Sequence, residues 1–441
     1  MASNDMAVGA VEQHVPAGRH SLLAAQQVLV SSVWLDPLYI ASAGGLGAAL
    51  ATNLVTATFL GAGFVTLVQS TRLVRLPVVE GPSSAFDALA VGYAKTGNLA
   101  ASSTGLLIAA GVVLLAALTG GVTQLRRLLS SAVTGTVVTL VGVSLAGFTL
   151  QEFFGTPGTA DFASPATLGL ALATTAVVVV GSAAAPRFRA FCFLAALVVG
   201  DVLALALGRL DFSPTSEQPW LGAPSLLPYG SLTFDLGVTV AMTIVFLVAV
   251  VEALGMYEAT AKVTGAPLTS RQASRGVAGE AVGTALSAVT GGFGTTAYAQ
   301  NLGVIKMTGV ASRAVIRTAA LIFLFLAFVP KLAAILVATP APVVGGLFLP
   351  AAATVLMTGL NLVVQDRGDP LRNLVAPLSL LTAIGIPAMS SSFTGWPPLL
   401  VELASSELIV GAIVVVMLEL ALTLGPDVLR RWNHTMRDDK E

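Results

Sequence analysis

The sequence predicts an all-α polytopic membrane protein with fourteen transmembrane segments, arranged as an inverted repeat of seven plus seven. Three observations lead to this fold class: charge is scarce, long apolar runs recur along the chain, and the basic residues lie between those runs. The chain has 441 residues, of which 55% are hydrophobic and only 10% charged, and its mean hydropathy is +0.86. Because a soluble globular domain carries about 25% charged residues, this composition excludes a soluble enzyme.

Charge balance and metal-binding residue types narrow the function classes further. The chain has 22 Lys and Arg against 23 Asp and Glu, which leaves no basic surface for a nucleic acid. Its one cysteine, Cys192, excludes an intrachain disulfide and a cysteine cluster for zinc or iron-sulfur. The three histidines, His14, His20 and His434, all lie in the polar tails. We therefore expect no metal site, no cofactor and no nucleic-acid partner.

Fourteen apolar runs are candidates for spanning helices, which need roughly 20 residues. Their approximate positions are 20–44, 47–70, 77–93, 99–120, 130–150, 166–185, 189–208, 233–261, 274–292, 297–310, 314–336, 342–364, 372–390 and 404–425. The first run follows a polar stretch with no basic segment and no small-residue cleavage site, so we interpret it as a retained span rather than a signal peptide. The longest polar connection, 209–230, is predicted to be an external loop.

The basic residues predict the orientation of these spans, because cytoplasmic loops carry an excess of Lys and Arg. With the N-terminus inside, about 18 of the 22 fall on inner segments, while Lys95, Arg209 and Lys331 fall on outer ones and Lys306 within a span. A missed or invented span would scramble this alternation. The pattern therefore favours fourteen spans and both termini in the cytoplasm.

Seven is an odd number, so two related halves must cross the membrane in opposite senses, as in the inverted repeats of secondary transporters. Such folds bind substrate at interrupted spans in matching positions of the two halves. Here the third span of each half is interrupted, by prolines and a glycine at 77–82 and by three glycines at 291–294. Each break predicts a short extended segment that leads into a half-helix. Together the breaks are the first candidate for a binding site, although each alone could be a kink used only for packing.

Acidic residues inside the spans are the second pointer, because each is costly in the bilayer and usually faces a cavity or a partner. Glu252 lies halfway along the eighth span, with no basic residue within a helical turn. It is a candidate for binding substrate and a proton, or else a protonated glutamate bonded to neighbouring backbone. Glu280, near the start of the ninth span, is a weaker candidate that could be structural. Gln27 in the first span is either a ligand or a hydrogen-bonding residue between helices.

At this point the residues carry a family resemblance. The stretch 300–309, Gln-Asn-Leu-Gly-Val-Ile-Lys-Met-Thr-Gly, resembles the signature of the nucleobase-ascorbate transporter family, and its extension through Arg313 is most similar to the bacterial xanthine and urate permeases. Glu252 in a Glu-x-x-Gly element and Glu280 are similar to acidic positions in the family's eighth and ninth spans. The run 84–86, Ser-Ala-Phe, resembles an element of its third span. The resemblance covers nearly the whole chain in span count and is strongest over 246–317.

The resemblance implies a core domain that moves against a gate domain, with two short antiparallel strands in spans 3 and 10 meeting at mid-membrane. It also implies a homodimer that forms through the gate domain. The expected domains are a cytoplasmic tail (1–19), core spans 1–4 (20–120), gate spans 5–7 (121–208), the external loop (209–230), core spans 8–11 (231–336), gate spans 12–14 (337–425) and a second cytoplasmic tail (426–441).

The resemblance further implies a site for a planar nucleobase. Glu252 would accept hydrogen bonds from ring N–H groups and Gln300 would bind the other edge of the base. Phe86 would lie against the ring face or supply a backbone N–H, and Asn301 would orient the loop. The expected substrate-binding residues are Glu252, Gln300, Phe86, Ala85, Ala299, Asn301 and Gln27, with Glu252 and Glu280 as the proton-coupling residues.

Two positions depart from the family pattern. Gln27 stands where many members have histidine, and Met256 stands where many have Asp or His. Both changes remove titratable groups and leave open whether H⁺ or Na⁺ is coupled, although Glu252 can still carry a proton. Gln300, in place of a glutamate, favours xanthine or urate over uracil.

We therefore expect proton-coupled uptake of an oxidised purine. The alternatives are a uracil permease of the same family, a bicarbonate- or sulfate-type anion transporter of the same fold, and a non-transporting sensor. An enzyme embedded in the membrane is disfavoured, because no histidine lies in the interior of a predicted span.

Overall fold

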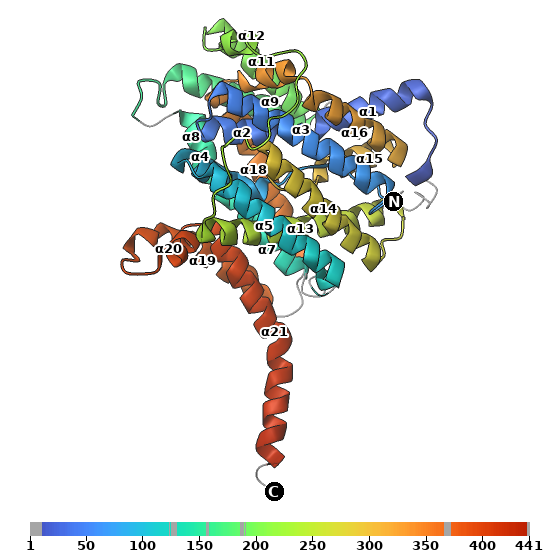
Figure 1. The fold of residues 1–441 in the computed structure, drawn as a ribbon, viewed down its shortest axis with the longest axis vertical. Helices are drawn as coiled ribbons and strands as arrows, with labels where there is room; N and C mark the ends of the chain where they lie inside the picture. The colour runs from blue at the N-terminus through green and yellow to red at the C-terminus, as the bar shows by residue number, and fades with distance from the viewer. Residues whose placement is uncertain are drawn as a thin grey trace. The chain divides into compact units, whose positions relative to one another are not determined.

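The computed structural model is built almost entirely of helices and describes residues 11–122, 124, 130–155, 158–185, 189, 191–365 and 372–438 (Figure 1). Its internal contacts divide the chain into two compact units. The large unit comprises Met1–Val122 and Leu145–Ala352, and the small unit comprises Thr123–Ser144 and Ala353–Glu441.

Six helices in the described part of the chain are long and apolar enough to cross a membrane. They are Ala48–Thr71, Leu99–Thr119, Ala132–Phe154, Pro165–Ala183, Leu236–Thr264 and Ala341–Val364. A pair of helices, Arg313–Ala327 and Pro330–Val337, would form a seventh span that bends by 83° at a short break. The prediction of a multi-pass helical membrane protein is confirmed, whereas the number of fourteen spans stays a prediction.

The large unit is centred on α3, which packs against α14 and α16, while α5 packs against α13 and α14. Its elements are α1 (Ala17–Ser31), α2 (Leu35–Ala43), α3 (Ala48–Thr71), β1 (Glu80–Pro82), the 3-10 helix η2 (Ser84–Phe86), α4 (Asp87–Thr96), α5 (Leu99–Thr119), α8 (Ala146–Phe154), α9 (Pro165–Ala183), α11 (Cys192–Ala206), α12 (Ser213–Ser216), α13 (Leu236–Thr264), α14 (Ser270–Thr290), β2 (Thr295–Ala297), α15 (Ala299–Thr308), α16 (Arg313–Ala327), α17 (Pro330–Val337) and the first part of α18 (Ala341–Gln365).

Glycines allow the helices around α3 to approach closely. A Cβ atom at Gly63 of α3 would lie 2.9 Å from the carbonyl oxygen of Ala320 in α16, and one at Gly283 of α14 would lie 2.0 Å from Cγ2 of Val65 in α3. Neither distance is tolerated between real atoms. Small residues at these crossings therefore set the helix spacing, as is typical of helix packing in membranes.

Both predicted breaks form strands, which confirms the two short antiparallel strands. β1 pairs with β2 in the register Glu80 with Ala297, Gly81 with Thr296, and Pro82 with Thr295. Backbone hydrogen bonds extend the ladder at each end, from Ser83 N to the Gly294 carbonyl and from Tyr298 N to the Val79 carbonyl (both 2.9 Å). Because water is absent at membrane depth, this pairing satisfies backbone groups that no helix can satisfy.

The first predicted span, 20–44, is interrupted in the structure. Ser32 ends α1 in the left-handed conformation with φ of 56°, and the chain restarts as α2 at Leu35. Pro37 lies in the first turn of α2, where its missing N–H breaks no helical hydrogen bond. The expectation of one continuous apolar helix missed this turn, because serine in a left-handed conformation leaves little trace in an apolar run.

In the described part of the small unit, the helices α7, α19 and α21 pack together. Its elements are α7 (Ser131–Ser144), the last part of α18, the 3-10 helices η3 (Arg372–Leu374) and η4 (Ser390–Ser392), α19 (Val375–Ala388), α20 (Pro398–Ala404) and α21 (Glu407–Asp438). α19 packs along α21, and both contact α7 (Figure 1). Gly411 of α21 faces Leu140 of α7 and Ala383 of α19 at distances that leave no room for a Cβ atom.

Candidate substrate site

Glu252 lies on α13 beside the point where β1 runs into the 3-10 helix η2. Ser83 Oγ donates a hydrogen bond to Glu252 Oε2 at 3.0 Å. One turn earlier, the Ala249 carbonyl accepts a hydrogen bond from Thr296 Oγ1 of β2 at 3.2 Å. The Glu252 side chain is half-buried, and in the described part of the chain no Lys or Arg forms an ion pair with it. The carboxyl group is therefore free to accept further N–H donors.

Phe86 and Ala85 follow this junction in η2, and both are buried. The Phe86 ring lies 6.2 Å from the Phe246 ring of α13. It also covers the backbone of Gly294, where a Cβ atom would come within 2.3 Å of it. The Phe86 N–H donates to the Ser83 carbonyl at 3.0 Å. This N–H could bind a base only if that hydrogen bond broke, whereas the Phe86 ring could contact a base without breaking it.

Gln27 of α1 and Asn301 of α15 bind each other. Asn301 Nδ2 donates to Gln27 Oε1 at 2.7 Å and to the Gln27 carbonyl at 3.0 Å, and both side chains are almost fully buried. This is the contact between helices that the sequence left open for Gln27. Within the described part of the chain, Asn301 Oδ1 is buried and accepts no hydrogen bond.

The first two residues of α15, Ala299 and Gln300, complete the expected set. The structure describes their backbone as the first turn of that helix, but their side chains lie outside the described part of the molecule. Tyr298 directly precedes them and lies against β1, because a Cβ atom at Gly81 would collide with its ring. The backbone of the signature segment is thus held at the strand pair, within reach of η2 and α13.

Glu280 of α14 belongs to a separate buried group. It accepts hydrogen bonds from Tyr257 Oη (2.6 Å) and Thr295 Oγ1 (3.0 Å), and Gln69 Nε2 donates to Tyr257 Oη at 2.8 Å. Glu80 of β1 is fully buried and has Glu280 and Tyr257 as its side-chain neighbours. Glu280 is therefore near the strands but bonds to none of the residues around Glu252.

A third acidic group lies next to Glu252. Asp36 of α2 accepts hydrogen bonds from Ser84 Oγ (3.1 Å) and Tyr298 Oη (2.7 Å). Asp87, the first residue of α4, is an electrostatic neighbour of both Asp36 and Glu252. Two adjacent serines thus bind different carboxyl groups: Ser83 donates a hydrogen bond to Glu252, and Ser84 donates one to Asp36.

Comparison with known proteins agrees with this architecture. Residues 18–392 match a family model described as "Permease family". The chain belongs to this family of permeases, the nucleobase-ascorbate transporters. Uric acid permease PucK of Bacillus subtilis is 30% identical over 393 residues, which cover 87% of this chain and 90% of that protein. Nucleobase transporter PlUacP of Paenibacillus larvae is 28% identical, with 88% and 91% covered.

Solved structures support the fold of the permease. The transmembrane domain of the cyanobacterial bicarbonate transporter BicA aligns with a TM-score of 0.62 at 16% sequence identity, covering 93% of this chain and 99% of that one. At this identity the likeness concerns the fold alone. The family assignment also places the permease among transporters rather than enzymes.

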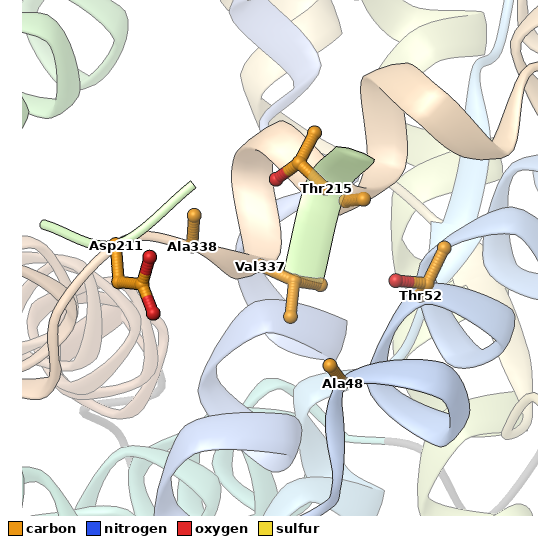
Figure 2. Close-up of a pocket in the computed structure, with 7 residues that line it drawn as sticks. Ala48, Thr52, Asp211, Thr215, Val337 and Ala338 are labelled. Atoms are coloured by element: carbon orange, nitrogen blue, oxygen red, sulfur yellow. The ribbon is translucent and has the colours of Figure 1, made fainter. Parts of the chain in front are cut away.

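Two surface hollows of the permease lie away from Glu252. Figure 2 shows the smaller, of about 60 Å³, where Asp211 and Thr215 from the loop before α13 approach Thr52 of α3 and the end of α17. The larger, of about 250 Å³, is lined by the N-terminal segment around His14 and by Arg317 of α16. Small-molecule sites usually enclose about 300–1,000 Å³, so both hollows are smaller than a usual small-molecule site.

Asp36, Asp87 and Glu80 are polar residues of this region that the sequence did not single out. Each stands where an apolar run ends or is interrupted, and carboxyl groups there are usually solvated. The available signal was their position: Glu80 and Asp87 bracket the proline-glycine break, and Asp36 precedes a proline within a run. Burial of all three, at 0%, 1% and 5% exposure for Glu80, Asp87 and Asp36, is what marks them out in the structure.

Proposed function

We propose that this permease takes up a nucleobase, an oxidised purine such as xanthine or urate, across the cytoplasmic membrane together with protons. The observation that carries the proposal is the position of Glu252, whose carboxyl group meets the strand junction through Ser83. In a chain with 10% charged residues, a carboxylate in a membrane helix without a basic partner is a functional group by default. Purinediones offer the adjacent ring N–H donors that such a carboxylate accepts.

The other expected contacts are part of the same proposal. Gln300 would read the opposite edge of the base, while Phe86 would border its ring face. Asn301, tied to Gln27, would hold the start of α15 in place, and the free N–H groups of that helix start favour a carbonyl oxygen of the base. The names of the relatives, a uric acid permease and a nucleobase transporter, support this substrate class.

Coupling and architecture complete the proposal. Fourteen spans in an inverted repeat would place a core domain (spans 1–4 and 8–11) against a gate domain (spans 5–7 and 12–14), with both termini in the cytoplasm. Two copies would associate through the gate domain. Glu252 and Glu280 are the coupling residues expected from the sequence, and Glu280 would act from within its own network with Tyr257 and Thr295.

A first experiment tests substrate and site together. Cells that lack their own base permeases would express the chain and take up labelled xanthine, urate, guanine or uracil. We expect uptake of xanthine or urate, and Glu252→Gln should abolish it, because an amide supplies one acceptor where the base needs two. Glu217→Gln, a change in the external loop, is the matched control and should keep full uptake.

The outcomes discriminate between the candidate functions. Uptake of uracil alone would move the substrate to a pyrimidine. Uptake of bicarbonate or sulfate without uptake of any base would favour the alternative function, an anion transporter with a fold similar to that of BicA. Full activity in Glu252→Gln would remove the proposed role of that residue. Binding of a base without counterflow would indicate a sensor.

A further inference from the structure

Beside Glu252 lies a pair of buried carboxyl groups that the proposed function has not used. We propose that Asp36 and Asp87 together bind the coupling proton, as one proton shared between two carboxyl groups. Asp36 belongs to α2 and Asp87 begins α4, and these two helices pack against each other. Their side chains are 5% and 1% exposed. The proposal rests on base transport by this chain, and it assigns proton coupling to this pair in place of Glu252 and Glu280, the residues that the sequence indicated.

The two carboxyl groups differ in what they bind. Asp36 accepts hydrogen bonds from Ser84 and Tyr298, one on each oxygen, which is the environment of an ionised carboxylate. Both oxygens of Asp87 are buried, and no donor in the described part of the chain bonds to them. An ionised carboxylate without partners inside a protein is strongly unfavourable. A protonated Asp87 removes this cost, and its O–H has the remaining lone pairs of Asp36 as a nearby acceptor.

The surroundings of the pair carry negative or neutral groups. The titratable side chains that face it are Tyr298 from the segment after β2, Glu252 from α13 and Tyr39 from α2 itself. No basic side chain is among these neighbours. Two like charges in low dielectric repel strongly, so the pair retains one proton more readily than it holds two negative charges.

A proton fits this site better than a metal ion. Within the described part of the chain, no group of three or more His, Cys, Asp or Glu side chains could hold a metal. In addition, the two groups bonded to Asp36 are hydroxyls that donate to it. A sodium ion would need several oxygen acceptors in place of these donors.

The chemistry of the base site also calls for a separate proton-binding group. Glu252 accepts ring N–H donors only as a carboxylate, so it cannot hold the coupling proton while it holds the base in this way. Gln27 and Met256 cannot take a proton either. Asp36 and Asp87 supply two titratable groups in the immediate neighbourhood of Glu252, and they are joined to it through consecutive residues, because Ser83 bonds to Glu252 and Ser84 to Asp36.

The proposed cycle conserves charge and protons. When a proton enters from outside, an O–H bond forms on Asp87, and the charge of the pair changes from minus two to minus one. Base binding at Glu252 and the start of α15 orders Ser83 and Tyr298, and so keeps Ser84 and Tyr298 in position to bond to Asp36. On the cytoplasmic side the base leaves, the O–H bond breaks, and the proton passes to water.

Proteoliposomes test the proposal with labelled xanthine and, in a parallel series, labelled urate. Accumulation driven by a pH gradient is compared with counterflow at equal pH, and proton entry is followed with a trapped pH dye. In Asp87→Asn we expect gradient-driven accumulation to fall about tenfold or more while counterflow stays within about threefold of wild type. Proton entry on addition of base should disappear.

Further variants keep the test decisive if Asp87→Asn folds poorly. Asp36→Asn should give the same uncoupled phenotype, and the double variant should be no worse than either single one, because the pair holds one proton. Asp201→Asn is the control, since Asp201 is also a carboxyl group with one buried, unpartnered oxygen in the described part of the chain. Its side chain is half-buried, and its other oxygen accepts a hydrogen bond from Thr339 Oγ1 at 3.1 Å. It should keep both activities. All variants are checked for a monodisperse elution profile.

Each result has a definite reading. Proton-driven accumulation that persists in Asp87→Asn and Asp36→Asn overturns the proton site but leaves base transport standing. Loss of counterflow together with accumulation, in well-folded protein, would assign the pair to base binding instead. If wild type neither accumulates nor exchanges xanthine or urate, the proposed function and the proton site both fail.

Discussion

At the scale of single residues, Ser83 provides the hydrogen bond that holds the Glu252 carboxyl group, at 3.0 Å. Ser83→Ala removes this donor and leaves the carboxylate less well oriented for the base. A hydrogen bond to a charged group contributes about 1.5–3 kcal/mol when buried, and Glu252 is only half-buried. We therefore expect the KM for base uptake to rise about fivefold, corresponding to roughly 1 kcal/mol, with little change in expression.

Ser102→Ala serves as the control for this prediction. Ser102 of α5 is buried, and its hydroxyl donates to the Leu99 carbonyl of its own helix at 2.9 Å, so its loss should leave the KM unchanged. The measurement is the concentration dependence of initial uptake. Equal KM values for Ser83→Ala and wild type would show that Glu252 needs no help from Ser83 in binding the base.

The sequence was informative about some of these residues and silent about others for a physical reason. Glu252 stands in the middle of an apolar run, where solvation cannot explain a carboxyl group, and its position next to the strand junction agrees with that interpretation. Asp36 and Asp87 lie inside the predicted spans 20–44 and 77–93, but each is close to an interruption of its span, where a carboxyl group is ordinarily solvated. Only the packing of α2 against α4 buries them and brings them together, and such a contact is not encoded in any local pattern.

At the scale of elements, the crossing of α3 and α14 depends on Gly283. A Cβ atom there would lie 2.0 Å from Cγ2 of Val65, and valine has few rotamers with which to move away. Gly283→Ala should therefore destabilise the protein by about 1–3 kcal/mol, seen as a lower midpoint of thermal unfolding in detergent. Val65→Ala in the same chain should recover most of the loss, because it removes the colliding methyl group.

Gly111→Ala tests whether any glycine substitution would do the same. Nothing lies within 4 Å of a Cβ atom at Gly111 of α5, so alanine there should be neutral or slightly stabilising, by about 0.5–1 kcal/mol. A drop in the unfolding midpoint for Gly111→Ala as large as for Gly283→Ala would rule out close packing as the cause. So would a failure of Val65→Ala to rescue Gly283→Ala.

Elements interrupted by proline and glycine were predictable, whereas the interruption of the first span was not. Residues 77–82 contain two prolines and a glycine, and residues 291–294 contain three glycines. The first segment forms the strand β1 and the second leads into β2. The turn between α1 and α2 rests on Ser32 in a left-handed conformation, a residue type that also occurs freely inside membrane helices. The matching positions of the two breaks, about 214 residues apart, suggested that the breaks meet. The register of the two strands could not be predicted, because it depends on tertiary contacts.

At the scale of the whole molecule, composition alone separates this chain from soluble proteins, because 45 charged residues cannot cover a water-facing surface of 441 residues. The exposed side chains on the membrane helices agree, since Leu115 and Leu118 of α5 are 64% and 71% exposed. Some apolar helices, such as Cys192–Ala206 and Val375–Ala388, are shorter than the thickness of the bilayer, so helix length alone does not decide whether they are spans. For these segments the predicted number of spans depends on the placement of the basic residues.

Cysteine labelling tests that placement, because the chain has a single cysteine and its side chain is buried. In a Cys192→Ser background, cysteines are introduced singly at Glu217, in the loop before α13, and at His434, in the C-terminal segment. The predicted topology puts seven spans between them, an odd number, so they should lie on opposite sides. In intact cells a membrane-impermeant maleimide should label the cysteine at 217 and not that at 434, and after permeabilisation it should label both. The Cys192→Ser parent should stay unlabelled and keep its uptake.

Labelling of both positions in intact cells would require an even number of crossings after the loop and would contradict the seven-plus-seven arrangement. Labelling at 434 alone would reverse the predicted orientation and contradict the interpretation of the basic residues as cytoplasmic.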